Sequence, residues 1–120
     1  MSDYFRSVSL LDKELARKVW SQREDISLIN AMGHFFGFKS IFNDFMIKAF
    51  SELKSRNLHS ASEVVKIYGN FATVELYWLF DIVTSEEQAE RRSGRETLFL
   101  EKTDNEWQIV HVHYSGMPIN

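Results

Sequence analysis

The clearest pattern in the chain is a run of apolar residues at helical spacing within residues 38–53. The apolar residues of this run are Phe38, Ile41, Phe42, Phe45, Met46, Ala49, Phe50 and Leu53. Steps of three and one alternate along it, which is typical of a helix that buries a wide apolar face. A weaker helical pattern occupies residues 4–19. Because Asp12 could cap a new helix there, we predict a bend near residues 9–12.

The second half of the chain shows patterns typical of β-strands. Four segments are rich in β-branched and aromatic residues: 62–69, 71–84, 95–102 and 106–115. We interpret residues 84–94 as a polar hairpin loop. Earlier in the chain, a short strand is predicted at 25–30, followed by a glycine-flanked loop at 31–37. Helices followed by a run of strands predict one α+β domain over residues 1–120, with helices on one face of a curved antiparallel sheet.

Alternation along the predicted strands divides their side chains between two faces. In residues 72–83 the even-numbered side chains are all apolar, whereas the odd-numbered ones are mixed. The even face should meet the helices, because burying polar groups is costly. An odd-length turn near residues 104–106 would pair Leu98 with Tyr114, so that even-numbered residues of the last two strands would lie on the same face of the sheet. A two-residue turn at Asp104 and Asn105 would invert this arrangement, and the pattern leaves both open.

His111 and His113 stand two residues apart in the last predicted strand, so their side chains point to the same side. That side is the expected outer face, which they share with Trp107, Ile109, Phe99 and Tyr77. Because such a face is too apolar to be left in water, we predict that it packs against a second copy of the chain. The expected interface residues are His111, His113, Glu75, Tyr77 and Arg95.

The two histidines also allow a metal site, with Glu75 as the third ligand. Two imidazoles and a carboxylate can form a facial set of ligands. However, no fourth ligand is apparent, and the expected interface occupies the same face. We therefore expect no metal ion and no cofactor.

Composition narrows the classes of function. Cysteine is absent from the 120 residues, which excludes disulfides and thiolate chemistry. The net charge of −3 argues against nucleic acid as a partner. No apolar run approaches the roughly 20 residues that cross a bilayer, and the N-terminus lacks the pattern of a signal peptide. A cytoplasmic protein that does not bind membranes is expected.

Trp78 and Tyr114 are the best candidates for contact with a ligand on the even face. Each combines a flat aromatic surface with one hydrogen-bond donor, although ordinary core packing is an even alternative. Leu98 would lie beside them, and Trp20 could close the pocket from the helix side.

Glu96 is the acid expected on the inner face of the last two strands. Burial would raise its pKa and suit it to acid–base catalysis. The favoured alternative is that it pairs with Arg92, Arg95 or solvent at the end of the strand. His34, in the glycine-flanked loop, is a second candidate proton carrier, or else caps the following helix.

The segment GRETLFLEKTDNEWQIVHVHYSGMP (94–118) resembles the C-terminal hairpin of the nuclear transport factor 2-like superfamily, in its SnoaL-like branch. It is also similar to the association domain of calcium/calmodulin-dependent protein kinase II. GHFFGFKSIFNDF (33–45) and FATVELYW (71–78) fit the same superfamily. The resemblance implies a cystatin-like cone, with a curved sheet wrapped on N-terminal helices around a pocket, and pairing through the sheets.

The resemblance also bears on chemistry. The association domain carries arginines in its pocket, but Trp78, Leu98 and Tyr114 stand at the matching positions here, which removes the charge that would bind an anion. Steroid isomerases of the same fold carry a carboxylate base in the strand before the glycine loop. This chain has Leu28, Ile29 and Asn30 in that region, so isomerase chemistry of that type is not supported.

The leading expectation is a SnoaL-like homodimer that binds a small apolar or aromatic ligand without reacting with it. The alternative is a small lyase, isomerase or cyclase that acts on a carbonyl compound, with Glu96 or His34 as the proton carrier. A third reading, an association module that oligomerises a larger partner, has less support because the chain contains no partner domain.

Overall fold

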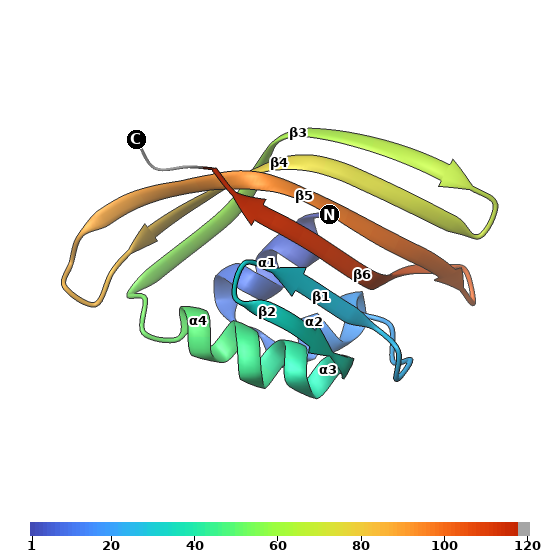
Figure 1. Ribbon diagram of the computed structural model, residues 1–120, viewed down its shortest axis with the longest axis horizontal. Helices are drawn as coiled ribbons and strands as arrows, with labels where there is room; N and C mark the ends of the chain where they lie inside the picture. Colours follow the sequence, from blue (N-terminus) through green and yellow to red (C-terminus); the bar gives the residue numbers. More distant parts are fainter. Residues whose placement is uncertain (118–120) are drawn as a thin grey trace.

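The computed structural model describes residues 1–117 as a group of helices under a curved six-stranded sheet (Figure 1). The helices are α1 (Ser2–Leu10), α2 (Lys13–Val19), and a longer helix formed by α3 (Gly37–Lys39), a π-helical stretch (Ser40–Ile47) and α4 (Lys48–Phe50). The strands are β1 (Ser27–Asn30), β2 (Gly33–Phe36), β3 (Ser55–Tyr68), β4 (Phe71–Val83), β5 (Ala89–Thr103) and β6 (Glu106–Gly116). None of the helices in this part of the chain is long and apolar enough to cross a membrane.

The N-terminal helices bend where the sequence predicts. Leu11 has a left-handed backbone, with φ at 48°, and ends α1. Asp12 then caps α2, because its Oδ1 accepts a hydrogen bond of 3.1 Å from the Leu15 amide. Such a cap satisfies one of the free N–H groups at the start of a helix. The bend turns Tyr4 and Val8 of α1 toward the sheet, where both are buried.

The apolar run of residues 38–53 forms the predicted helix, which starts at Gly37 and ends earlier, at Phe50. The side chains on its buried face are those of Ile41, Phe42, Phe45 and Met46. Beyond its end, the guanidinium of Arg56 donates to the carbonyls of Phe50, Leu53 and Ser9. This arginine therefore ties β3 to the end of the helix and to α1.

The sheet is mixed, because β1 runs parallel to β6 while all other neighbours are antiparallel. Its strand order is β2-β1-β6-β5-β4-β3. The predicted loop at residues 31–37 is wrong, since residues 33–36 form β2. Phe35 of this strand faces the helix and packs on Phe45, with ring centroids 5.4 Å apart. Four residues are too few for an alternating pattern to distinguish a strand from a loop.

Two strands are longer than their patterns predict. The interpretation of residues 84–94 as a loop is wrong, because β5 already begins at Ala89. Similarly, β3 begins at Ser55 rather than near residue 62. The first part of β5 is polar because it is largely exposed. It is held by backbone pairing to β4 and by the bidentate pair of Arg91 with Asp81, at 2.6 and 2.9 Å.

The last hairpin combines a tight turn with a bulge. Asp104 and Asn105 form a two-residue turn in which both φ values are positive, at 52° and 64°. This turn would invert the faces, but the register shifts by one residue between the Phe99–His111 and Leu100–Ile109 pairs. On the far side of the bulge from the turn, even-numbered residues of β5 therefore pair with even-numbered residues of β6.

The bulge decides the register that the sequence pattern left open, and it corrects the placement of Ile109. Leu98 pairs with Val112 rather than with Tyr114, whose partner is Glu96. Ile109, expected on the outer face, lies before the bulge and is buried in the core at 1% exposure. Trp107 shares the side of Ile109, since alternate residues of a strand point the same way.

The core lies between the helices and the even face of β4. The six even side chains of this strand, at positions 72, 74, 76, 78, 80 and 82, are all buried. The predicted α+β cone, with its apolar even face turned to the helices, is confirmed.

Candidate functional site

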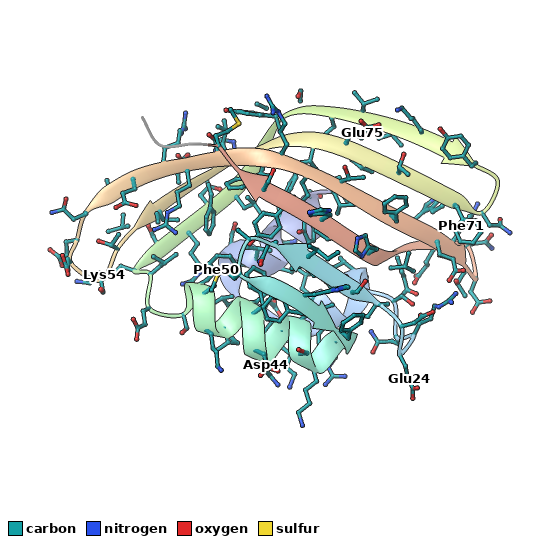
Figure 2. All side chains as sticks on the ribbon, viewed as in Figure 1. Glu24, Asp44, Phe50, Lys54, Phe71 and Glu75 are labelled. Atoms are coloured by element: carbon teal, nitrogen blue, oxygen red, sulfur yellow. The ribbon has the colours of Figure 1, made fainter. Side chains whose placement is uncertain are left out.

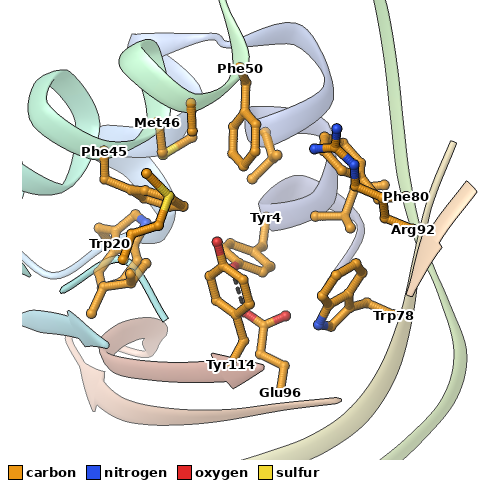
Figure 3. A pocket seen from close by; sticks show the side chains of 15 residues that line it. Tyr4, Trp20, Phe45, Met46, Phe50, Trp78, Phe80, Arg92, Glu96 and Tyr114 are labelled. Atoms are coloured by element: carbon orange, nitrogen blue, oxygen red, sulfur yellow. Dashed lines mark hydrogen bonds between the residues drawn. The ribbon is translucent and has the colours of Figure 1, made fainter. Parts of the chain in front are cut away.

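A cavity of about 310 Å³ opens between the inner face of the sheet and the helices (Figure 3). Its wall is mostly apolar and comes from α1, the 37–50 helix and the sheet. The principal apolar lining residues are Trp20, Phe45, Met46, Phe50, Trp78 and Phe80. The polar groups that line it belong to Tyr4, Arg92, Glu96 and Tyr114. Three of the predicted ligand contacts, Trp20, Trp78 and Tyr114, thus share one cavity.

Glu96 is the acidic group of this cavity. Its side chain is 5% exposed, and its Oε2 accepts a hydrogen bond of 2.6 Å from the Tyr4 hydroxyl (Figure 3). Burial raises the pKa of Glu96 to about 7, and the hydrogen bond from Tyr4 acts in the opposite direction. The alternative of an arginine partner is wrong, because Arg92 pairs with Glu90 at 3.4 Å and Arg95 is exposed on the outer face.

Tyr114 faces Glu96 across the β5–β6 pair. Its ring meets Trp78 edge to face, with centroids 5.8 Å apart, and its hydroxyl accepts a hydrogen bond of 3.1 Å from Asn30 Nδ2. Burial, more than any neighbouring group, raises the pKa of Tyr114 to about 12. The phenol therefore stays neutral throughout the physiological range.

Two indole groups complete the wall. The indole N–H groups of Trp20 and Trp78 are buried and have no hydrogen-bond partner within residues 1–117. The Trp78 ring lies directly over Gly94 of β5, where a Cβ atom would overlap both the ring and the Ser115 carbonyl. Leu98 is different from the other predicted contacts, since it is fully buried and does not line the cavity.

Sequence reasoning missed Tyr4 and Asn30 as parts of this site. Tyr4 belongs to the weak helical pattern of residues 4–19, and a phenol on an apolar helix face is a signal for a buried acceptor. In the sequence, Asn30 is notable only because it lies in the region where steroid isomerases carry an acid and this chain has none. Its role depends on the parallel pairing of β1 with β6, which no local pattern reveals.

The predicted interface residues lie on the opposite, outer face of the sheet. Glu75, Tyr77, Arg95, His111 and His113 line one hollow there, and Figure 2 shows Glu75 on the side of the sheet away from the helices. The Nδ1 of His111 is 2.8 Å from the Ser27 hydroxyl. Burial, followed by the charges of His113 and His34, lowers the pKa of His111.

His34 does not line the cavity. It lies exposed on β2, and its ring contacts Phe36, with centroids 4.0 Å apart. Of the two proposed proton carriers, only Glu96 is therefore in a position to reach a ligand in the cavity.

The outer face does not bring a set of metal ligands together. Glu75 forms an ion pair of 2.6 Å with Lys66. Within residues 1–117, no three His, Asp or Glu side chains are grouped so that they could hold a metal ion.

Solved structures share this fold over almost the whole chain. A nuclear transport factor 2-like superfamily protein from Salmonella enterica serovar Typhimurium has 28% identity and a TM-score of 0.90, covering 99% of this chain and 87% of its own. A candidate calcium/calmodulin-dependent protein kinase II association domain from Xanthomonas campestris has 16% identity and a TM-score of 0.81, covering 99% and 84%. These similarities define the class as a nuclear transport factor 2-like fold.

A third neighbour is the hexachlorocyclohexane dehydrochlorinase LinA-type3 from Novosphingobium barchaimii, with 12% identity, a TM-score of 0.80, and coverage of 99% and 82%. No protein with a curated description matches the sequence significantly. The SnoaL-like domain family matches residues 1–120, and the chain belongs to this family.

Proposed function

We propose that the protein binds a small apolar or aromatic molecule in the cavity between the sheet and the helices. The observation that carries the proposal is the cavity itself, which is large enough for an aromatic ring and lined mainly by aromatic and sulfur-containing side chains. Pockets of this composition, with a few polar groups, are typical of small-molecule sites. Family membership supports the proposal, as does the shared fold of an enzyme named for hexachlorocyclohexane.

The functional unit in this proposal is a homodimer formed through the outer face of the sheet. Phe36 and Phe99 are 61% and 44% exposed there, and Tyr77 is half-buried on the same face. Apolar side chains gathered on one face indicate a contact surface. The hollow lined by His111 and Arg95 lies on the same face, so polar groups would be available at the contact.

Binding of naphthalene tests the cavity as the site. Ala49 lines the cavity, so Ala49→Phe should occupy part of its volume, whereas Ala61→Phe adds the same atoms at an exposed position of β3. We expect naphthalene to raise the melting temperature of the wild type and of Ala61→Phe, but not of Ala49→Phe. Equal stabilisation of both variants would place binding elsewhere and contradict the proposal.

Glu96 favours one second candidate, an enzyme that moves a proton on a carbonyl compound. A carboxyl with a pKa of about 7 in an apolar cavity is suited to act as a general base near neutral pH. In this function the ionised Glu96 would remove a proton from the carbon next to the carbonyl and later return it.

The test of this second function is exchange of the methyl protons of acetophenone into D₂O, followed by NMR. The wild type should accelerate the exchange above buffer, and Glu96→Gln should abolish the acceleration while binding persists. Exchange that is equally fast in the variant would rule out Glu96 as the base.

A further inference from the structure

The orientation of the Asn30 side chain is determined by the backbone. Its Oδ1 lies 2.8 Å from the Met32 amide nitrogen and 3.1 Å from the Gly33 amide nitrogen. Backbone N–H groups can only donate, so the atom that receives both bonds must be the oxygen. The other end of the amide, Nδ2, is therefore the atom that faces the Tyr114 hydroxyl at 3.1 Å.

This orientation decides how the Tyr114 hydroxyl is used. An amide NH₂ group can only donate, so the bond from Asn30 occupies a lone pair of the phenol oxygen. The phenol hydrogen must then point in another direction. Within residues 1–117, the structure shows no acceptor for this hydrogen among the hydrogen bonds of Tyr114.

The free hydrogen lies at the cavity. Tyr114 lines it, and Figure 3 shows the hydroxyl projecting among the lining side chains, on the side of Tyr4 and Phe50. Tyr114 is half-buried, and a donor that is shielded from water without a partner costs free energy, which a ligand with an acceptor would recover. The other side-chain acceptor oxygens along the wall are those of Tyr4 and Glu96, which bond to each other, and within residues 1–117 neither accepts a hydrogen bond from Tyr114.

We infer that the ligand is an uncharged carbonyl compound whose oxygen accepts a hydrogen bond from the Tyr114 hydroxyl, and that Asn30 selects this chemistry by holding the hydroxyl as a donor. The inference rests on the proposed ligand-binding function and specifies the ligand class for the same cavity. Asn30 is a positioning residue, since it does not line the cavity.

The absence of a net charge on the ligand follows from the surroundings. The interior holds Glu96 and two phenols, and an anion beside an ionised Glu96 would be repelled. The one cationic group among the lining residues, Arg92, is exposed and already paired with Glu90 at 3.4 Å. A carbonyl dipole fits this interior without the cost of burying a charge.

Two probes of nearly equal shape test the inference. Acetophenone carries a C=O group where α-methylstyrene carries C=CH₂, so the ratio of their dissociation constants isolates the acceptor. Tyr114→Phe removes the donor. Asn30→Asp keeps an oxygen for the Met32 and Gly33 amides, but its second oxygen accepts from Tyr114 and turns the hydrogen away from the cavity.

We expect the preference for acetophenone over α-methylstyrene to fall about 5- to 10-fold in both variants, the range expected for one hydrogen bond. Asn70→Asp, in the exposed β3–β4 turn, adds the same charge far from the site and should keep the wild-type ratio. Binding of α-methylstyrene also reports whether the cavity of each variant is intact.

A measurement on the wild type makes the test independent of the variants. The infrared C=O stretch of bound ¹³C-labelled acetophenone should lie at lower wavenumber than in hexane, as for a carbonyl that accepts a phenol hydrogen bond. An unshifted stretch, or a ratio unchanged in both variants, would overturn the inference while leaving apolar binding in place. If neither probe binds the wild type, the proposed function fails, and the inference fails with it.

Discussion

The Tyr4 hydroxyl of α1 donates a hydrogen bond of 2.6 Å to the Glu96 carboxylate of β5, although the two residues are 92 positions apart. Both side chains are buried, so the bond joins the helical layer to the sheet at the wall of the cavity. Hydrogen bonds to a charged group contribute more than neutral ones, but only when that group is ionised. The contact is therefore sensitive to pH.

The first prediction concerns the pH dependence of stability. Burial raises the pKa of Glu96 from 4.5 to about 7, so the folded protein binds this proton more tightly than the unfolded chain. The free energy of unfolding should therefore fall as the pH rises from about 4.5 to about 7, by roughly 3 kcal/mol in total. The glutamine in Glu96→Gln cannot ionise, so this variant should lack that part of the pH dependence of stability. Urea unfolding at pH 4.5, 6 and 8 measures it, and parallel pH profiles for both proteins would contradict the assignment.

The second prediction concerns the Tyr4 donor. In Tyr4→Phe the ionised Glu96 keeps its burial but loses this bond, so its pKa should rise further above 7. The free energy of unfolding should fall by about 1–3 kcal/mol, and more at pH 8 than at pH 5. Tyr68→Phe, at a position that is 63% exposed, is the control. An NMR titration of the Glu96 carboxyl carbon would disprove the prediction if its pKa were unchanged.

The third prediction concerns the packing of the Trp78 ring on Gly94. In Gly94→Ala the added methyl group would overlap the Trp78 ring and the Ser115 carbonyl, so strand β6 or the indole must move. We expect a loss of about 1–3 kcal/mol, typical of overpacking in a close-packed core. Gly116→Ala is the matched control, because its nearest neighbour, the Ser93 carbonyl oxygen, is 3.9 Å away. Equal unfolding midpoints in urea would mean that the close approach at Gly94 is unimportant.

Periodicity predicted those parts of the fold that local patterns determine. The wide apolar face of the 37–50 helix, the Asp12 cap and the even face of β4 each depend on residues close in sequence, and all three were predicted. The bulge that buries Ile109 was not, since a bulge adds one residue without a distinctive pattern. Strand β2 was missed for a similar reason, because its four residues are too few to show a period.

The candidate site was only partly predictable. Trp78 and Tyr114 could be assigned to the inner face by alternation, but the partners that orient them could not. Tyr4 meets Glu96, and Asn30 meets Tyr114, only through contacts between distant segments. The ligand, the homodimer and the cytoplasmic location remain predictions.

The last prediction concerns the homodimer. Phe99 is 44% exposed on the outer face, and its ring centroid lies 5.9 Å from that of His111. Phe99→Asp should weaken association by roughly 100-fold, because burying an unpaired carboxylate at an interface costs about 3 kcal/mol or more. Leu10→Asp introduces the same charge at an exposed apolar position of α1, and the dimer should persist there. Sedimentation velocity over a range of concentrations should give a dimer for the wild type and Leu10→Asp, and a monomer for Phe99→Asp. If the wild type sediments as a monomer at every concentration, the predicted homodimer is wrong. If Leu10→Asp dissociates and Phe99→Asp does not, the interface lies on the helical side of the molecule.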